Sequence, residues 1–185
     1  IKVGAPAAGG VQIEPPFFAY GGHRGMERVR LDLKSDEGTA AFLRLAADAD
    51  VVIESFRPGV VDRLGIGYEA VKAVNPGVVY CATSGYGQDG PKSQWAGHDV
   101  NYLAAGGYFA CAGRGPDGEL TLPGATVADI AAGGMQAVIA ILAALVGRAE
   151  SGEGAYLDVS VAAGVVGMLA LLIDEHLATG VLPEP

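Results

Sequence analysis

The chain has 185 residues, of which 12 are Lys or Arg and 21 are Asp or Glu, giving a formal net charge of −9. Half of the residues are hydrophobic and only 18% are charged, which excludes a disordered chain, because disordered chains are poor in apolar residues and rich in charge. The acidic balance argues against a general nucleic-acid binder, which needs a basic face. The length suits one ordinary domain with a hydrophobic core.

The two cysteines, Cys81 and Cys111, stand in no recognised spacing, which argues against a disulfide framework and a cysteine-based zinc site. We therefore expect free thiols, no metal centre and a reducing, cytoplasmic location. The chain lacks an initiator methionine and begins with Ile1, Lys2 and Val3, a pattern typical of the end of a strand. We expect it to be incomplete at both ends.

Strand and helix patterns alternate along most of the chain. Residues 4–25 are rich in Gly, Pro and Ala and are expected to form an ordered loop inside an N-terminal segment, 1–28. The remainder, 29–185, is predicted to be one α/β domain, a Rossmann-like parallel sheet with flanking helices and right-handed crossovers. Strands are expected at 29–33, 51–53, 78–83 and 156–159, and helices at 35–48, 58–65, 68–74, 100–110, from 129 onward and from 160 to about 178.

Ligands of such sheets bind at the carboxyl ends of the strands. Those ends fall at Lys34, at 54–57 and at 84–91. Seven basic residues gather near this edge. Arginine pairs with phosphate through two parallel hydrogen bonds, so the group indicates a phosphate-bearing ligand, and solvated surface charge is the alternative. The seven are Arg24, Arg28, Arg30, Lys34, Arg57, Arg63 and Lys92.

Two apolar runs approach the length of a membrane-spanning helix. Residues 130–146 are apolar except for Gln136, and residues 159–173 are similar apart from Ser160. Asp129 and Arg148 bracket the first run, which is rich in Ala and Gly. We interpret it as a buried helix of an enclosed α/β domain and expect no membrane association.

The glycines Gly85, Gly87 and Gly90 follow a predicted strand and match the spacing of the dinucleotide-binding pattern. Pro91 follows directly, and no acidic residue lies about 20 residues further on, as that pattern requires. We therefore favour a loop that passes close to a ligand or to another backbone over nicotinamide binding.

Two residues stand in settings that suit proton transfer. His98 falls where a loop gives way to a predicted helix, between Gly97 and Asp99. Asp129 begins a nearly uncharged, Gly-rich helix. The simple interpretation of Asp99 and Asp129 is that each caps a helix. The functional interpretation is that His98 and Asp129 take part in general acid–base or nucleophilic catalysis.

Four segments carry a family resemblance. Residues 53–59 (IESFRPG), 64–68 (LGIGY) and 84–91 (SGYGQDGP) resemble, in this order, the family III CoA-transferases of the CaiB/BaiF superfamily. Residues 96–102 (AGHDVNY), together with Asp129, are similar to one branch, the α-methylacyl-CoA racemases. The resemblance implies that the chain is part of the large domain of this family. It also implies an interlocked homodimer and a second domain that this chain lacks.

The resemblance implies roles for His98 and Asp129. In the racemase branch, a histidine and an aspartate at these places exchange the α-proton of a 2-methylacyl-CoA thioester. In the transferase branch, the matching aspartate is a nucleophile that forms a mixed anhydride. We expect a racemase, with a CoA-transferase or an inactive CoA-binding fragment as alternatives. Coenzyme A is then part of the substrate, and no other cofactor is expected.

The resemblance also implies contacts with CoA. Residues 31–34 match the stretch near the adenine and ribose, 55–57 match the next loop, and 97–102 line the thioester. Arg63 matches a phosphate-binding arginine, and Arg24 fits an arginine in the loop before Leu31. The implied contacts are Arg24, Leu31, Asp32, Leu33, Lys34, Ser55, Phe56, Arg57, Arg63, Gly97, Asp99, Val100, Asn101 and Tyr102.

Overall fold

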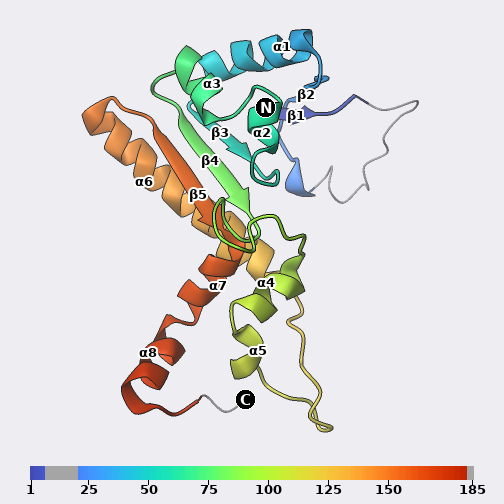
Figure 1. The fold of residues 1–185 in the computed structure, drawn as a ribbon, viewed down its shortest axis with the longest axis vertical. Coiled ribbons are helices and arrows are strands. Elements are labelled where there is room, and N and C mark those ends of the chain that lie inside the picture. Colours follow the sequence, from blue (N-terminus) through green and yellow to red (C-terminus); the bar gives the residue numbers. More distant parts are fainter. Residues whose placement is uncertain (7–20, 183–185) are drawn as a thin grey trace.

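The computed structural model describes residues 1–6 and 21–182. Two parallel sheets organise it (Figure 1). The larger has the strand order β3-β4-β5 and joins β3 (Val51–Glu54), β4 (Val79–Ser84) and β5 (Ala155–Ser160). The smaller pairs β1 (Lys2–Gly4) with β2 (Arg28–Arg30). The expected α/β fold with a parallel sheet is confirmed.

The helices lie on both faces and at one end of the larger sheet (Figure 1). They are α1 (Asp36–Ala47), α2 (Val60–Arg63), α3 (Tyr68–Val74), α4 (Asp99–Ala105), α5 (Tyr108–Cys111), the π-helix η2 (Ala128–Met135), α6 (Gln136–Ser151), α7 (Val161–Met168) and α8 (Ala170–Thr179). In the view of Figure 1, α4 and α5 descend beside α7 from the carboxyl end of the sheet, and α6 runs along β5.

The central strand β4 explains the layering. Its residues are almost all buried, as expected for a strand with a partner on each side and helices on both faces. Successive side chains of a strand point to opposite faces. Tyr80 accordingly packs with residues of α1 and α3, and Cys81 packs with Ala137 of α6. The sheet is therefore enclosed between α1 and α3 on one face and α6 on the other.

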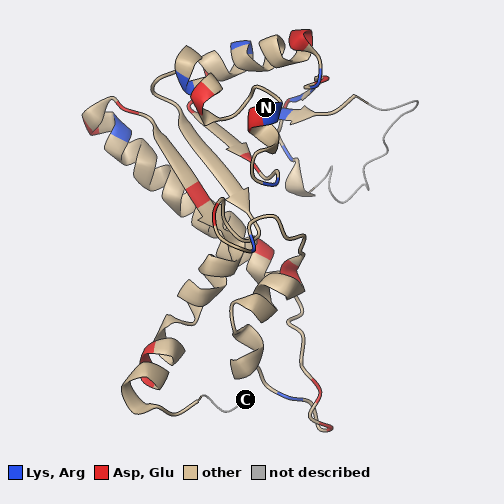
Figure 2. Cartoon of the chain, viewed as in Figure 1, with Lys and Arg blue, Asp and Glu red and all other residues tan. Residues whose placement is uncertain are grey.

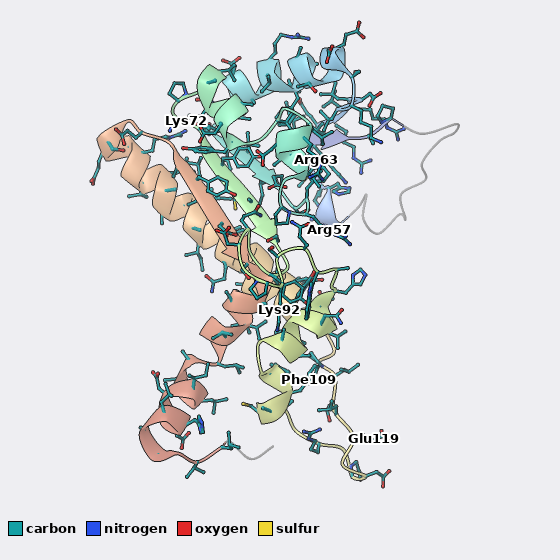
Figure 3. All side chains as sticks on the ribbon, viewed as in Figure 1. Arg57, Arg63, Lys72, Lys92, Phe109 and Glu119 are labelled. Carbon is teal, nitrogen blue, oxygen red and sulfur yellow. The ribbon has the colours of Figure 1, made fainter. Side chains whose placement is uncertain are left out.

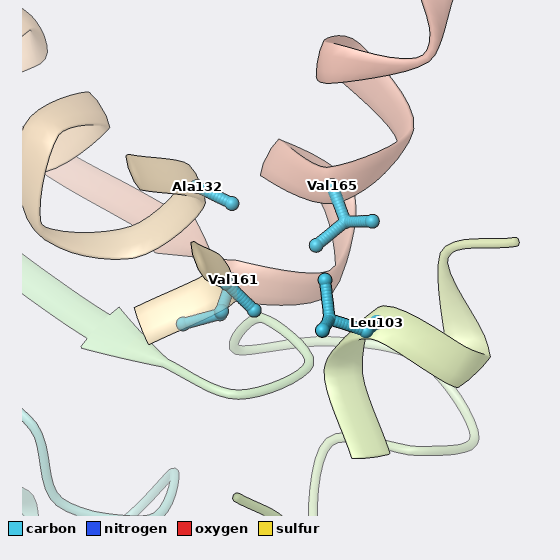
Figure 4. Close-up of a cluster of buried hydrophobic side chains, with 5 residues drawn as sticks. Leu103, Ala132, Val161 and Val165 are labelled. Carbon is cyan, nitrogen blue, oxygen red and sulfur yellow. The ribbon is translucent and has the colours of Figure 1, made fainter. Parts of the chain in front are cut away.

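A third buried cluster holds the helices at the carboxyl end of the sheet together. It joins α4, η2 and α7 through Leu103, Ala128, Ala132, Val161 and Val165 (Figure 4). Gly164 of α7 lies against Ala132, where an added Cβ would stand 2.2 Å from the Ala132 carbonyl oxygen. This close backbone approach fixes η2 against α7, and α4 packs on both.

The helix signals in the sequence were mostly correct. Ser35 caps α1, since its hydroxyl accepts from the backbone N–H of Gly38 at 3.1 Å. The predicted helix at 100–110 is instead two helices, because Gly107 adopts a φ of 90° and separates α4 from α5. Asp129 is not an N-cap, because η2 begins at Ala128.

Two expectations about strands and segments changed. The strand predicted at 29–33 is shorter, and it pairs with β1 in the separate two-stranded sheet. Much of the loop expected at 4–25 lies outside the described residues. The division at residue 28 stays a prediction, and β1 and β2 pair across it.

The expectation of a buried helix at 130–146 is wrong for most of this run. Only Ala132, Gly133 and Ala137 of that run are buried. The continuous helix Ala128–Ser151 is long and apolar enough to cross a membrane, and only 17% of its apolar stretch is buried. Together, α7 and α8 are also long and apolar enough, but they are bent by 60°. Core helices of water-soluble proteins can have the same length and composition. One apolar face of α6 is therefore uncovered within the described part of the chain.

The end of α6 is nevertheless fixed to the sheet. Arg148 forms an ion pair with Asp50 at 2.7 Å and donates to the carbonyl oxygen of Gly77 at 3.0 Å. Asp50 directly precedes β3, and Gly77 lies shortly before β4. These contacts set the register of α6 along the sheet.

Candidate active site

A cavity of about 430 Å³ opens at the carboxyl ends of β3 and β4, the edge predicted to bind a ligand. Three segments form it: the loop after β3, the loop after β4, and the segment that leads into α4. The lining residues are Ser55, Phe56, Arg57, Pro58, Ser84, Gly85, Ser93, Trp95, Ala96, Gly97, His98, Asn101 and Tyr102.

Tyr102 forms a fixed wall of this cavity. Its hydroxyl donates to the carbonyl oxygen of Gly97 at 2.7 Å, and its ring meets Tyr86 edge-on at 5.2 Å. Cβ atoms added at Gly85 and Gly97 would stand 2.4 and 2.6 Å from the ring carbon Cε1. The ring therefore fills space that only glycine leaves free. Burial raises the pKa of the Tyr102 hydroxyl, and the nearby charge of Asp129 adds to this.

His98 begins α4 as its N-cap residue. Its backbone N–H donates to the side-chain oxygen of Asn101 at 3.0 Å, which fixes the turn into the helix. The imidazole is exposed and lines the cavity. The sequence predicted this place, where a loop gives way to a helix.

Asp129 lies in the first turn of η2, and its backbone N–H donates to Oδ1 of Asp99 at 2.9 Å. Burial raises the pKa of the Asp129 carboxyl, and the negative charge of Asp99 raises it further. The charge of His98 acts in the opposite direction. The three residues thus form one electrostatic cluster, although Asp129 is not a lining residue of the cavity.

A second cavity, of about 520 Å³, lies between the start of α1 and the end of α2. Two basic residues, Lys34 and Arg63, line it. Arg57 lines the first cavity, and Figure 3 shows Arg57 and Arg63 on neighbouring segments of the molecule. Figure 2 shows further Lys and Arg positions along the chain around α1 and β2. Each cavity therefore has at least one cation that can bind a phosphate.

The structure brings most of the predicted site residues into these two cavities. Ser55, Phe56, Arg57, Gly97, His98, Asn101 and Tyr102 line the first. Leu33, Lys34 and Arg63 line the second. Arg24, Leu31, Asp32, Asp99, Val100 and Asp129 line neither. Two of these have local partners instead, since Asp32 accepts from the backbone N–H of Lys34 and Asp99 accepts from that of Asp129.

Six residues that line the first cavity were missed as individual site residues. Ser84 and Gly85 lie in the predicted ligand edge, and that placement was the available signal. Trp95 had a signal of its own, because it is the single tryptophan of the sequence. In the structure it is 58% exposed, and the Lys92 ammonium lies 5.4 Å from its ring. Pro58 and Ala96 belong to the motifs at 53–59 and 96–102, whereas Ser93 carries no feature that marks it in the sequence.

Neither a metal cluster nor a disulfide occurs in the described part of the chain. Residues 1–6 and 21–182 contain no group of three or more His, Cys, Asp or Glu side chains that could hold a metal ion. Cys81 is buried and Cys111 is partly buried, and both are unpaired. Burial raises the pKa of the Cys81 thiol to about 11, so it is inert near neutral pH.

A comparison with known families matches residues 6–185 to the model of CoA-transferase family III. The chain belongs to CoA-transferase family III. A solved CAIB/BAIF family protein from Brucella suis is 38% identical with a TM-score of 0.81, and the match covers 86% of this chain and 42% of that one. The resemblance seen in the sequence motifs is therefore confirmed at the level of family and fold.

Relatives within the family have different activities. Acetyl-CoA:oxalate CoA-transferase of Acetobacter aceti is 38% identical over 161 residues, covering 87% of this chain and 41% of the relative. The α-methylacyl-CoA racemase of Mus musculus is 39% identical over 150 residues, covering 80% of this chain and 39% of the relative. The chain thus spans about two fifths of the length of these relatives, and identity alone does not separate the two activities.

Proposed function

We propose that the chain is part of an acyl-CoA enzyme that racemises the α-carbon of 2-methylacyl-CoA thioesters. One observation carries the proposal: a histidine that lines the cavity lies in the same electrostatic cluster as a carboxyl group of raised pKa. Racemisation needs two groups of this kind, one that removes the α-proton and one that returns a proton to the opposite face.

The proton balance is simple. Neutral His98 accepts the α-proton, the C–H electron pair moves into the thioester to give an enolate, and protonated Asp129 donates its proton to the other face. The reverse direction starts from protonated His98 and ionised Asp129. Burial and the charge of Asp99 favour the protonated form of Asp129, which is the form required for donation.

The cations of the two cavities are proposed to hold the CoA phosphates. Lys34 and Arg63 share one cavity, and Arg57 lies in the other beside Ser55 and Phe56. Arginine and phosphate form short, charge-assisted hydrogen bonds. We include Leu31, Asp32, Asp99 and Val100 in the same proposal, because each lies within two residues of a lining residue. Arg24 is included on the family resemblance alone.

A second candidate is a CoA-transferase in which Asp129 is the nucleophile. The transferase relative from Acetobacter aceti matches a larger share of this chain than the racemase relative does. An ionised Asp129 carboxylate could attack a thioester carbonyl, which would release the CoA thiolate and leave a mixed anhydride. A raised pKa disfavours this role, because a nucleophilic carboxylate must be ionised.

The assembly and location of the protein are further parts of the proposal. We propose a homodimer in which a second subunit covers the exposed apolar face of α6. The unpaired cysteines fit a reducing, cytoplasmic location. Light scattering of the complete protein tests the homodimer, and cell fractionation tests the cytoplasmic location.

The activity is tested with a single enantiomer of a 2-methylacyl-CoA in deuterated water. The racemase proposal expects deuterium at the α-carbon and formation of the other enantiomer. Transfer of CoA to a free acid without α-exchange would establish the transferase instead. CoA binding without either reaction would show a binding protein and refute both catalytic candidates.

A further inference from the structure

Ser84 is the one polar residue buried in the core of the described chain, with 9% of its surface exposed. It is the last residue of β4, the central strand of the larger sheet. Its hydroxyl Oγ has no hydrogen-bond partner among the described residues. Buried polar side chains almost always have a partner, so an orphaned hydroxyl is a sign of a ligand or of stored strain.

The surroundings of Ser84 favour a ligand. The residue lines the first cavity together with Ser55, Arg57 and His98. The pairing of Glu54 with Ala82 places Ser84 level with the loop that follows β3. On its other side, Gly85 touches the ring of Tyr102. Ser84 therefore belongs to the floor of the cavity, between the loop that carries Arg57 and the segment that carries His98.

We propose that Ser84 is a positioning residue for the substrate, and that its Oγ–H donates a hydrogen bond to an amide carbonyl of the pantetheine arm of CoA. The inference rests on the proposed function. The arm is the part of CoA that connects the phosphates to the thioester, so it must cross the floor between the cation and the histidine. A neutral hydroxyl is a suitable donor for an amide carbonyl, whereas the phosphates have arginine and lysine available.

Two variants test the hydroxyl. Ser84→Ala removes it, and Ser84→Cys keeps the size of the side chain with a weaker donor. We expect both variants to bind CoA about three- to tenfold more weakly by calorimetry, which is the range of one neutral hydrogen bond. The loss should be the same for dephospho-CoA, because the contact lies on the arm. Ser151→Ala is the control and should bind normally, since Ser151 is exposed at the end of α6 and lines neither cavity.

Melting of the ligand-free protein separates a ligand contact from a structural one. Removing an orphaned hydroxyl should leave the melting temperature of Ser84→Ala equal to that of the wild type or above it. A lower melting temperature of both variants would show that the hydroxyl has a protein partner, and would overturn the inference.

The affinities complete the test, which uses the complete protein that carries this chain. Wild-type protein that does not bind CoA would refute the proposed function and this inference together. Wild-type binding with unchanged affinity in Ser84→Ala would refute the inference alone. An equal loss in Ser151→Ala would refute it by removing the specificity for Ser84. A loss seen with CoA but not with dephospho-CoA would assign the hydroxyl to a phosphate and overturn the pantetheine contact.

Discussion

Oδ1 of Asp99 lies 2.9 Å from the backbone nitrogen of Asp129 and accepts its N–H. The bond joins the first residue of α4 to the first turn of η2, 30 residues later in the chain. It leaves two carboxyl groups near each other, and the charge of Asp99 raises the pKa of Asp129. Asp99 therefore acts on Asp129 in two ways, by fixing its backbone and by favouring its protonated form.

Replacing Asp99 with Asn separates these two effects. The amide oxygen of Asn still accepts the N–H of Asp129, but the negative charge is gone. We expect the pKa of Asp129 to fall, because a like charge that disfavours its ionised form has been removed. The step that needs protonated Asp129 is lost as pH rises through this pKa, so that limb of the pH–rate profile should move to lower pH. The control is Asp117→Asn, in the distant loop that also contains Glu119, which should leave the pH–rate profile unchanged. A limb that stays or moves to higher pH in Asp99→Asn contradicts the coupling.

The basic residues of the two cavities give a second prediction. Arg57→Ala and Arg63→Ala should each weaken CoA binding by roughly 1–3 kcal/mol, the range of a charge-assisted hydrogen bond. Arg44→Ala is the matched control, because Arg44 is exposed on α1 and lines neither cavity. A variant that has lost the contact to the 3′-phosphate should bind CoA and dephospho-CoA equally. Calorimetry showing wild-type affinity in both cavity variants would exclude these residues from the CoA site.

Local signals in the sequence predicted much of the fold. The continuous apolar run at 51–53, now in β3, and the alternation with helices were sufficient to predict a parallel sheet, and Ser35 with two following acidic residues predicted the start of α1. Ligands of parallel α/β sheets bind at the carboxyl ends of the strands. The loops after β3 and β4 were therefore correctly predicted to meet at this edge of the sheet.

Other features depend on contacts between distant residues and were not predictable. The break between α4 and α5 follows from the backbone of Gly107, and the sequence pattern there remains helical on both sides. The bond between Asp99 and Asp129 was missed because the sequence offered helix capping as a sufficient interpretation of each aspartate, although neither is an N-cap in the structure. The exposure of α6 was missed because an apolar run does not show which elements will cover it.

The glycine contacts of Tyr102 give a third prediction. Gly85→Ala should destabilise the fold by about 1–3 kcal/mol, because the added Cβ would overlap the Tyr102 ring and displace it. The cost should shrink in a Tyr102→Ala background, where the space is free. Gly113→Ala is the control, since no atom lies within 4 Å of its added Cβ. Denaturant unfolding of the four variants measures this, and an equal cost in both backgrounds would show that the ring is not the obstacle.

The buried thiol of Cys81 gives a fourth prediction, on stability at alkaline pH. Burial raises its pKa from 9.0 to about 11, so the folded protein holds a proton that the unfolded chain releases. This contribution is fully present below pH 9 and is lost as pH rises towards 11. The wild type should therefore lose on the order of 2 kcal/mol more than Cys81→Ala over this window. The check is denaturant unfolding at pH 8 and pH 10.5, with Cys111→Ala as the control. Parallel losses in wild type and Cys81→Ala would contradict the burial effect.

The last prediction concerns His98 and Asp129, on which the racemase proposal depends. Each alanine variant should lose racemisation in both directions, because a full turnover needs both groups. The loss of α-proton exchange with solvent deuterium should differ between the two enantiomers. His98→Ala should still incorporate solvent deuterium into the enantiomer whose proton faces Asp129, and Asp129→Ala should show the reverse preference.

The double variant sharpens this test. Residues that act as a unit are non-additive, so His98→Ala with Asp129→Ala should racemise little more slowly than the worse single variant. A transferase behaves differently, since Asp129→Ala would abolish covalent acyl capture while His98→Ala would leave CoA transfer nearly intact. The measurement is α-deuterium exchange on each enantiomer, followed by mass spectrometry. Normal racemisation by His98→Ala would refute the racemase proposal, because no second proton-transfer group would then be needed on the face that His98 serves.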